Sequence, residues 1–375
     1  MRGARGVTLD INNHPPNLPQ GRNKKNKKLN MTTFNDNFLK ACRREETPYT
    51  PLWLARQAGR YQKEYMKIKE KYSIIEISTI PEVSAEVTLL PINQFELDSA
   101  IIFSDILIPL GPMGISFEYK KGYGPHIHNP IKTVADVEKL KIVDPAIEMW
   151  YTGKALTILK GELNVPCIGF VGAPFTLASY MIEGGPSKNY EKMKAFMYNE
   201  PKAWHLLMDK LATVMANYLN FQIESGAMAV QIFDSWVGAL DIDDYNEYVY
   251  EHVEKMIQIV KSKYPTVPVI SMGVNSAHLI PSLKKAKPDV IALDWRTDMA
   301  KTWQELNYEV AIQGNLDPTA LFADWNIIEA KTKKILDALK GRPGHIFNLG
   351  HGILPGTPVE NVKQLCKFVH EYTRK

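Results

Sequence analysis

The sequence contains little cysteine: Cys42, Cys167 and Cys366 are the only three in 375 residues, and they lie far apart. No CxxC motif or Cys/His spacing of the kind that binds zinc occurs, so we expect no metal site. The one close histidine pair, His126 and His128, follows a Tyr-Gly-Pro turn, and we expect no metal there either. Scarce, unpaired cysteines are typical of a reducing compartment, which favours a cytoplasmic protein.

Several other signatures are missing. No apolar run approaches the roughly 18–20 residues that a membrane span requires. There is no GxGxxG after the first expected strand and no GxxxxGK[ST], so the usual cradle for a nucleotide cofactor is absent. No GxSxG nucleophile elbow occurs either. We therefore expect chemistry without a nucleotide cofactor and no contact with a membrane.

The net charge of +4 comes from one end of the chain. Residues 1–30 carry seven Lys and Arg against one Asp, so the rest of the chain has a net charge of −2. A nearly neutral body gives no reason to expect nucleic acid as a partner. The leader, residues 1–30, has no aromatic residue and no apolar stretch, which excludes a secretory signal. We expect it to be a disordered extension; the alternative is a basic arm around Lys24–Lys28.

Strand-like and helix-like segments alternate along residues 31–375. Unbroken apolar runs bounded by turn signals are typical of strands buried on both faces. Amphipathic patterns predict helices over 33–46, 65–72, 81–90 and 243–263. Eight such units favour a single (β/α)8 TIM barrel domain over 31–375, with a doubly wound open sheet as the alternative. The eight expected strands are 51–55, 99–103, 165–171, 228–233, 267–272, 289–293, 309–313 and 345–349.

A small or polar residue follows each expected strand. In a barrel these ends share one face, where barrel enzymes carry their active sites. Loops are polar in any protein and Asp commonly caps helices, so we expect about half of these positions to be structural. The residues that follow the strands are Arg56, Asp105, Gly172, Ser235, Asn275, Asp294, Asn315 and His351.

The segment Arg56-Gln57-Ala58-Gly59-Arg60-Tyr61 is the most informative of these strand ends. Two guanidinium groups with a glycine between them can turn toward one point. Arginine is well suited to bidentate recognition of carboxylate or phosphate. The alternative is a solvated pair of like charges on a helix, which is mildly unfavourable.

Four further residues have both a structural and a functional interpretation. Asp105 is either an N-cap or a carboxylate that faces a cationic or N–H-bearing ligand. His351 lies between two glycines, and we favour a functional role for it. Tyr180 could be a core tyrosine with a satisfied hydroxyl, and Ser235 could cap the following segment.

Together, seven ordered segments resemble the uroporphyrinogen decarboxylase family over nearly all of the chain from Phe34. The resemblance implies a (β/α)8 barrel that acts as a cytosolic homodimer in haem and porphyrin biosynthesis. It also implies a decarboxylase, a lyase, that needs no cofactor or metal and converts uroporphyrinogen III to coproporphyrinogen III by removing four acetate carboxyls as CO2. The segments begin at Arg56, Phe103, Gly172, Tyr180, Gln231, Gln313 and Asn348.

The same resemblance assigns roles to particular residues. It implies a catalytic set of Asp105, Arg56 and Arg60. It implies substrate contacts by 56–60, which includes Gln57, Ala58 and Gly59, and by Asp105, Tyr180, Ser235 and His351. The chemistry fits, because arginines can bind the acid arms of a tetrapyrrole while one central carboxylate accepts its pyrrole N–H groups.

Two other functions are compatible with the sequence. The fold family also contains zinc-dependent methyltransferases that serve corrinoid or thiol carriers. Against that reading, His351 is followed by Gly352-Ile353 and not by a cysteine. A non-catalytic tetrapyrrole-binding relative would share the fold, since fold alone does not decide function.

Overall fold

Seven parallel strands form the centre of the molecule in the computed structural model, which describes residues 33–120 and 122–375. The strand order is β1-β4-β5-β6-β7-β8-β9, so strands that follow one another in the sequence are neighbours in this sheet, and only β2 and β3 lie outside it. The predicted parallel barrel-type fold is confirmed, and the predicted leader over 1–30 lies outside the described residues. The strands are β1 (Ala100–Ile101), β4 (Cys167–Gly172), β5 (Ala229–Asp234), β6 (Val269–Gly273), β7 (Val290–Ala292), β8 (Ala311–Leu316) and β9 (His345–Leu349).

The expected first strand, 51–55, is reduced to a single bridge. Leu52 pairs in parallel with Phe347 of β9, and its carbonyl accepts a hydrogen bond from Asp98 N–H at 2.8 Å. The segment therefore lies between β9 and the residues that lead into β1, which is the eighth position of the ring. The prediction of a full strand here was wrong.

Side chains take the backbone donors that a full first strand would have used. Leu52 N–H donates to Asp98 Oδ2 (2.8 Å) and Ala55 N–H donates to Asn348 Oδ1 (2.9 Å). Since each N–H makes one good hydrogen bond, these groups are not available to a ladder. The Ala55 bond ends the pairing with β9, and the Leu52 bond occupies the side that faces β1, so the segment keeps its place in the ring with a single bridge.

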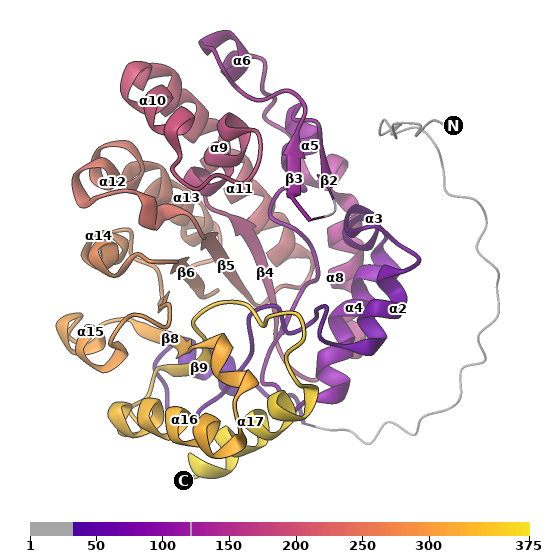
Figure 1. Cartoon of the computed structure of the whole chain (residues 1–375), viewed down its shortest axis with the longest axis vertical. Helices are drawn as coiled ribbons and strands as arrows, with labels where there is room; N and C mark the ends of the chain where they lie inside the picture. Colours follow the sequence, from indigo (N-terminus) through magenta and orange to yellow (C-terminus); the bar gives the residue numbers. More distant parts are fainter. Residues whose placement is uncertain (1–32, 121) are drawn as a thin grey trace. The chain divides into compact units, whose positions relative to one another are not determined.

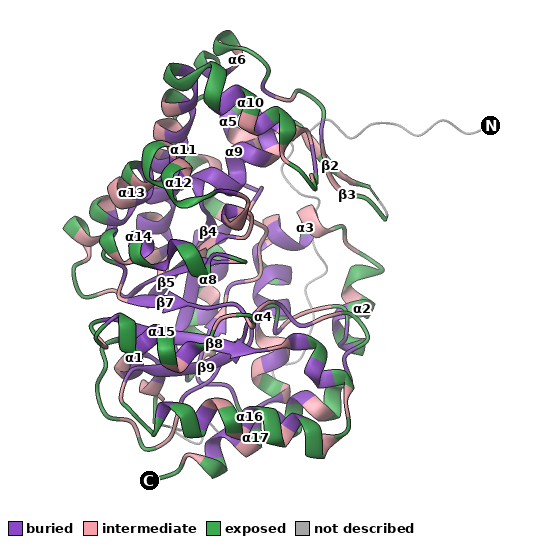
Figure 2. Ribbon diagram, turned by 60° about the vertical axis from the view of Figure 1, so that its left-hand side comes forward, coloured by how far each residue is buried: buried purple, intermediate pink, exposed green. Residues whose placement is uncertain are grey.

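Helices cover the outside of the sheet, and the strands are almost wholly buried (Figures 1 and 2). Many helices alternate with the strands, as predicted, and 3-10 turns occur at Val237–Ala239, Ala277–Leu279 and Pro318–Phe322. The helices are α1 (Asn37–Cys42), α2 (Lys63–Lys69), α3 (Ile74–Thr79), α4 (Pro81–Gln94), α5 (Leu110–Met113), α6 (Val134–Glu138), α7 (Pro145–Glu148), α8 (Trp150–Glu162), α9 (Pro174–Glu183), α10 (Glu191–Asn199), α11 (Pro201–Ser225), α12 (Ile242–Tyr248), α13 (Tyr250–Lys263), α14 (Ile280–Lys285), α15 (Met299–Glu305), α16 (Trp325–Leu339) and α17 (Val359–Tyr372).

The helix predicted over 243–263 is two helices, α12 and α13. Val249 separates them with φ −129° and ψ −44°, outside the helical region. Val249 is fully buried, and Asp241 caps α12 by accepting from the N–H groups of Asp243 and Asp244. The hydrophobic period continues across the break, which is why the sequence pattern did not reveal it.

An antiparallel hairpin interrupts the alternation between β1 and β4. It consists of β2 (Phe117–Lys120) and β3 (Gly124–Ile127), and Tyr119 lies opposite Pro125. Ile127 N–H donates to the carbonyl of Gly184 at 2.9 Å. Gly184 ends α9 in the left-handed conformation (φ 84°), which glycine adopts without strain. The hairpin is thereby held against the C-terminal end of α9.

A polar layer crosses the inside of the barrel. Trp53 Nε1–H donates to Gln313 Oε1 at 2.9 Å, and the Gln313 amide donates to Gln231 Oε1 at 3.3 Å. Apolar side chains such as Ile168 and Ile270 fill the space around them. Because these polar groups bond to one another, they can be buried at little cost.

Asp98 binds segments from near both ends of the described part of the chain and holds them against the base of the barrel. Its side chain is fully buried and accepts hydrogen bonds from Asn35, Tyr49 and Leu52 N–H. His370, on α17, approaches Asp98 Oδ2 at 2.7 Å. A buried carboxylate with this many partners holds α17 against the start of β1. Among the described residues, no helix is both long enough and apolar enough to cross a bilayer.

Candidate active site

Arg56 projects from the loop that follows the reduced first strand. Its φ is 58°, a left-handed conformation that is uncommon for a side-chain-bearing residue. Its side chain is exposed. The strained backbone is held from behind, because Gln57 is only 1% exposed and its Oε1 accepts from Leu54 N–H at 3.2 Å. Tyr61 O–H donates to the carbonyl of Gln57 at 2.6 Å. The predicted contact residue Gln57 thus has its side chain in the barrel wall, where it supports the Arg56 loop.

Ala58 and Gly59 complete this loop and are both partly buried. Ala58 packs in a small apolar cluster with Tyr65, and Gly59 N–H donates to Gln62 Oε1 at 3.0 Å. A Cβ on Gly59 would lie 3.2 Å from the carbonyl oxygen of Arg56. The glycine therefore allows the loop to fold back closely between the two arginines.

The loop that carries His351 crosses directly over Arg56. Ile353 N–H donates to the carbonyl of Ala55 at 2.9 Å. A Cβ on Gly352 would lie 2.3 Å from Cδ of Arg56, so the arginine side chain rests against the glycine backbone. Gly352 thus makes room for Arg56. In Figure 1 this connection, drawn in yellow between β9 and α17, passes in front of the strands.

His351 is neutral near pH 7. Burial, reinforced by Arg56 and then by Arg296, lowers its pKa to about 4. Gly352 N–H donates to Nδ1 at 2.6 Å, which places the proton of the neutral ring on Nε2. The neutral imidazole can donate one hydrogen bond into the mouth but is a poor general acid there.

Asp105 follows β1 and retains some solvent exposure although protein surrounds it closely. Desolvation raises the pKa of its carboxyl, while Tyr119, the N–H of Leu107 and the charge of Arg56 lower it in part. Leu107 N–H donates to Oδ1 at 2.9 Å. A carboxylate can accept about four hydrogen bonds, so Asp105 keeps free acceptor sites.

Two tyrosines flank Asp105. Tyr180, on α9, has its pKa raised by burial and by Asp105, so it holds its proton. Its ring lies 3.8 Å from the ring of Trp236. Tyr119, on β2, has a buried hydroxyl without a fully formed hydrogen bond to any described residue, although the group is near enough to Asp105 to affect its pKa.

Tyr119 was not among the predicted site residues. It comes from the hairpin that interrupts the strand–helix alternation, and the turn signal Tyr123-Gly124-Pro125 was the available hint of that hairpin. Trp236 was also missed, because it lies one residue past the predicted Ser235.

Ser235 lines a groove of about 320 Å³ next to this cluster. Trp236 belongs to the same groove and its ring packs against that of Tyr180, which joins the groove to the surroundings of Asp105. Lys188 and Lys194 add two cations to its lining. A larger groove of about 420 Å³, between residues 142–146 and α11, contains no predicted site residue.

Arg60 lies farther out on the same loop. It is exposed, and the groups that sense its charge are Tyr65 and Lys69 on α2. Burial and then the charge of Arg60 lower the pKa of Lys69. The two arginines thus have different surroundings, with Arg56 the one close to Asp105.

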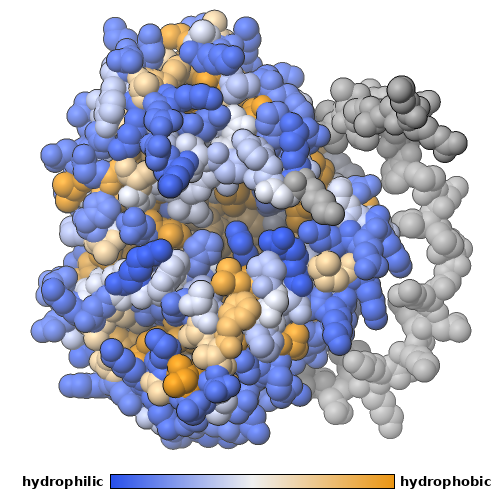
Figure 3. Space-filling model, viewed as in Figure 1, coloured by the Kyte–Doolittle hydropathy of each residue, from blue (hydrophilic) through white to orange (hydrophobic). Residues whose placement is uncertain are grey.

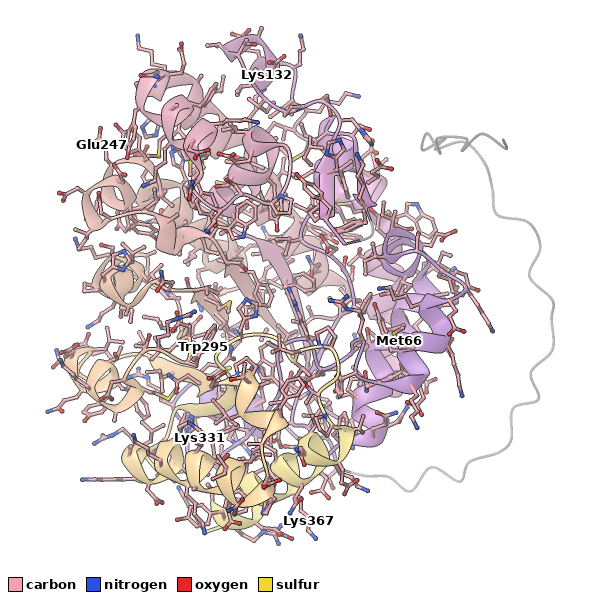
Figure 4. The ribbon with its side chains drawn as sticks, viewed as in Figure 1. Met66, Lys132, Glu247, Trp295, Lys331 and Lys367 are labelled. Carbon is pink, nitrogen blue, oxygen red and sulfur yellow. The ribbon has the colours of Figure 1, made fainter. Side chains whose placement is uncertain are left out.

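Arg296 supplies another cation that the strand-end pattern did not single out. Its guanidinium lies 3.8 Å from the ring centre of Trp295, and Asp294 Oδ2 is 3.8 Å from its Nη1. Trp295 meets the His351 ring edge-on at 6.2 Å, and Figure 4 shows it toward the middle of this face. In Figure 3 the same face is hollowed near its centre, with hydrophobic side chains inside and hydrophilic ones around the hollow.

The arrangement defines a class of protein: a parallel α/β barrel whose strand ends carry several cations around the desolvated carboxylate of Asp105. Such a mouth suits a ligand with acidic groups at its edge and N–H donors or positive charge at its centre. The three cysteines are all buried, and none belongs to the one cluster of metal-binding groups found in the described part of the chain.

The chain belongs to the uroporphyrinogen decarboxylase (URO-D) family, whose profile matches residues 33–372. It is 50% identical over 340 residues to a protein named uroporphyrinogen decarboxylase from Carboxydothermus hydrogenoformans, covering 90% of this chain and 97% of that one. A protein of the same name from Staphylococcus aureus strain JH9 is 49% identical over 342 residues, with 91% and 99% covered.

A solved structure of a methyltransferase from Methanosarcina mazei shares the fold. Its TM-score is 0.76 at 18% identity, and the match covers 91% of this chain and 99% of that one. At this low identity the likeness concerns the fold alone.

Proposed function

We propose that this chain decarboxylates uroporphyrinogen III, removing its four acetate carboxyls as CO2 to give coproporphyrinogen III. We also propose that it does so without cofactor or metal, as the family resemblance implies. The observation that carries the proposal is that Arg56 lies near enough to Asp105, Tyr180 and His351 to affect the pKa of each, although the three residues follow different strands. Segments that are far apart in the sequence thus come together around one cation, as a shared binding mouth requires.

The electrostatics fit a porphyrinogen. Its acid arms project from the edge of the macrocycle, where Arg56, Arg60 and Arg296 would bind them. Its pyrrole N–H groups point inward, where Asp105 would accept them with the lone pairs that Leu107 N–H leaves free. Tyr180 and Trp236 would provide an apolar wall against the ring.

Loss of CO2 requires a place for the electrons of the broken C–C bond. Protonation of the ring α-carbon next to the carbon that bears the acetate arm gives a cationic ring, which accepts that electron pair as CO2 leaves and forms an exocyclic methylene. A second proton then converts the methylene to a methyl group. The α-carbon releases the first proton, which restores the aromatic pyrrole, so each CO2 lost consumes one proton overall. In this proposal Asp105 stabilises the cation as it develops, the kind of preorganised electrostatic effect that is usually the largest catalytic contribution.

Neutral His351 and Tyr180 are proposed to orient the reacting acetate arm or an adjacent acid arm of the substrate by hydrogen bonds. The Ser235 groove lies beside Tyr180 and Trp236, so we propose that it receives another arm of the substrate. Its Lys188 and Lys194 would complement a carboxylate there. In this proposal Gln57, Ala58 and Gly59 contact the substrate through the backbone of the Arg56 loop.

The test is anaerobic incubation with freshly reduced uroporphyrinogen III, followed by oxidation and chromatography of the products. We expect products with seven, six, five and finally four carboxyls, with one CO2 released for each step. Binding of the tetrapyrrole without CO2 release would instead identify a non-catalytic relative. Failure to bind it would reject the proposal.

We further propose that the protein works as a homodimer in the cytoplasm, since the family resemblance implies both. Sedimentation velocity at micromolar concentration should then give about twice the monomer mass of 42.5 kDa. A single species of monomer mass that retains full activity would reject the dimer. Cell fractionation tests the cytoplasmic location.

A further inference from the structure

Two histidines from different helices meet on the outside of the barrel. His205 lies on α11 and His252 on α13, and their Nδ1 and Nε2 atoms are 2.9 Å apart. Glu251 Oε1 lies 3.1 Å from His205 Nδ1 and 3.4 Å from His252 Nε2. Two ring nitrogens and one carboxylate oxygen thus converge on one point, although 46 residues separate Glu251 from His205 in the sequence.

Neighbouring groups orient the His252 ring. Asp209 Oδ1 lies 3.1 Å from His252 Nδ1, so the proton of that ring sits on Nδ1 and the Nε2 lone pair faces the cluster. Lys255 Nζ donates to the same Asp209 oxygen at 3.0 Å, which fixes the carboxylate. A metal-binding histidine usually donates its other N–H to a carboxylate in this way.

The rings also have little freedom to turn. The His252 side chain is 3% exposed, and the His205 ring stacks on Tyr248 with centroids 6.1 Å apart. The neighbouring Trp204 Nε1–H donates to the carbonyl of Tyr248 at 2.9 Å, which anchors this part of α11. The side chains of His205 and Glu251 are 34% and 63% exposed, so the cluster opens to solvent on one side.

We propose that His205, Glu251 and His252 form a binding site for a borderline divalent transition metal such as Zn²⁺. Tetrahedral zinc with bonds of about 2.0–2.2 Å has its ligand atoms roughly 3.3 Å apart, and the three observed separations are 2.9, 3.1 and 3.4 Å. A hydrogen bond between the two rings explains their separation of 2.9 Å. It does not explain why Glu251 Oε1 lies near both ring nitrogens.

The donor set also indicates which ions fit. Imidazole nitrogens favour zinc, nickel, copper and cobalt, whereas magnesium and calcium prefer oxygen ligands. Three protein ligands leave the fourth position for water on the exposed side. The metal would link α11 to α13, so it would stabilise the fold and take no part in decarboxylation.

The test uses the full chain after removal of metal by dialysis against a chelator. We expect one Zn²⁺ per chain by competition titration, a cobalt absorption spectrum typical of tetrahedral coordination, and a higher Tm with saturating Zn²⁺. His205→Gln and Glu251→Gln change exposed side chains, and we expect each to weaken binding about tenfold or more. Both should also lose the rise in Tm and keep their decarboxylase activity.

The matched control replaces the other close histidine pair, His126→Gln with His128→Gln, which should bind Zn²⁺ as the unchanged chain does. Any of four results would overturn the proposal, and the first three concern Zn²⁺ binding. They are no binding by the unchanged chain below about 100 µM Zn²⁺, equal binding by His205→Gln and Glu251→Gln, or loss of binding in the His126/His128 control alone. Equal affinity for Mg²⁺ and Zn²⁺ would also overturn it.

Discussion

Replacing Gly352 by alanine should damage catalysis far more than stability. The added Cβ would lie 2.3 Å from Arg56 Cδ and 2.9 Å from Nε, whereas carbon atoms in contact lie about 3.5–4.0 Å apart. The Arg56 side chain must therefore move by more than about 1 Å, a misplacement that can lower kcat/KM by about 10–100-fold. Arg56 is exposed and flexible, so we expect a stability loss below about 1 kcal/mol.

Gly350, on the other side of His351, provides the matched control. A Cβ there would lie 2.2 Å from the backbone nitrogen of Trp295, which cannot move as a side chain can. Gly350→Ala should therefore lose about 2 kcal/mol or more of its free energy of unfolding. The measurements are kcat/KM from anaerobic decarboxylation and urea unfolding midpoints. A Gly352→Ala enzyme with unchanged kcat/KM would refute the argument that this glycine makes room for a working Arg56.

Three further substitutions test the roles assigned above. Asp105→Asn removes the charge beneath the developing cation and should lower kcat by well over about tenfold with little change in the unfolding midpoint; an enzyme of normal rate would remove Asp105 from the mechanism. Arg56→Lys keeps the charge but loses the planar fork, so we expect a higher KM; an unchanged KM would show that the fork of Arg56 does not bind an acid arm of the substrate. Asp98→Ala leaves the donors around it unpaired and should cost about 3–5 kcal/mol in urea unfolding, whereas a loss below about 1 kcal/mol would show that Asp98 does not hold α17 in place.

The sequence pattern predicted the alternation of strands and helices because buried parallel strands leave unbroken apolar runs. It failed at 51–55, where the side chains of Asp98 and Asn348 take the backbone N–H groups. Those residues are far away in the sequence, so no local pattern could reveal them. It also failed at Val249, where the apolar period runs through a break between two helices.

For the candidate site, the strand-end rule predicted Arg56, Asp105 and His351, which the fold brings to one mouth. The same rule could not identify Tyr119, because a hairpin inserted after a strand does not follow the strand–helix alternation. Nor could it reveal that Gly352 accommodates the Arg56 side chain. Such complementarity between distant segments exists only in the folded chain.

The pH dependence of kcat/KM tests the environment of Asp105 most directly, because kcat/KM reports ionisations of the free enzyme. Desolvation raises the pKa of this carboxyl above its ordinary value, so it takes up a proton at a higher pH than an exposed aspartate does. Protonated Asp105 can neither accept pyrrole N–H groups nor stabilise a cation. As pH falls, kcat/KM should therefore begin to decline at a higher pH than it would if Asp105 had the pKa of an ordinary aspartate, about 3.9.

Tyr119→Phe separates this explanation from its rivals. The Tyr119 hydroxyl lowers the pKa of Asp105, so its removal should shift the acid limb of the profile to higher pH. His351, with a pKa of about 4, and the buried carboxyl of Asp234 at the end of β5, whose pKa burial raises to about 7, are other groups that titrate on the acid side. If His351 caused the limb, His351→Gln would abolish it and Tyr119→Phe would leave it unchanged. The carboxylates of the substrate titrate identically in every variant, so only the difference between profiles identifies the group responsible.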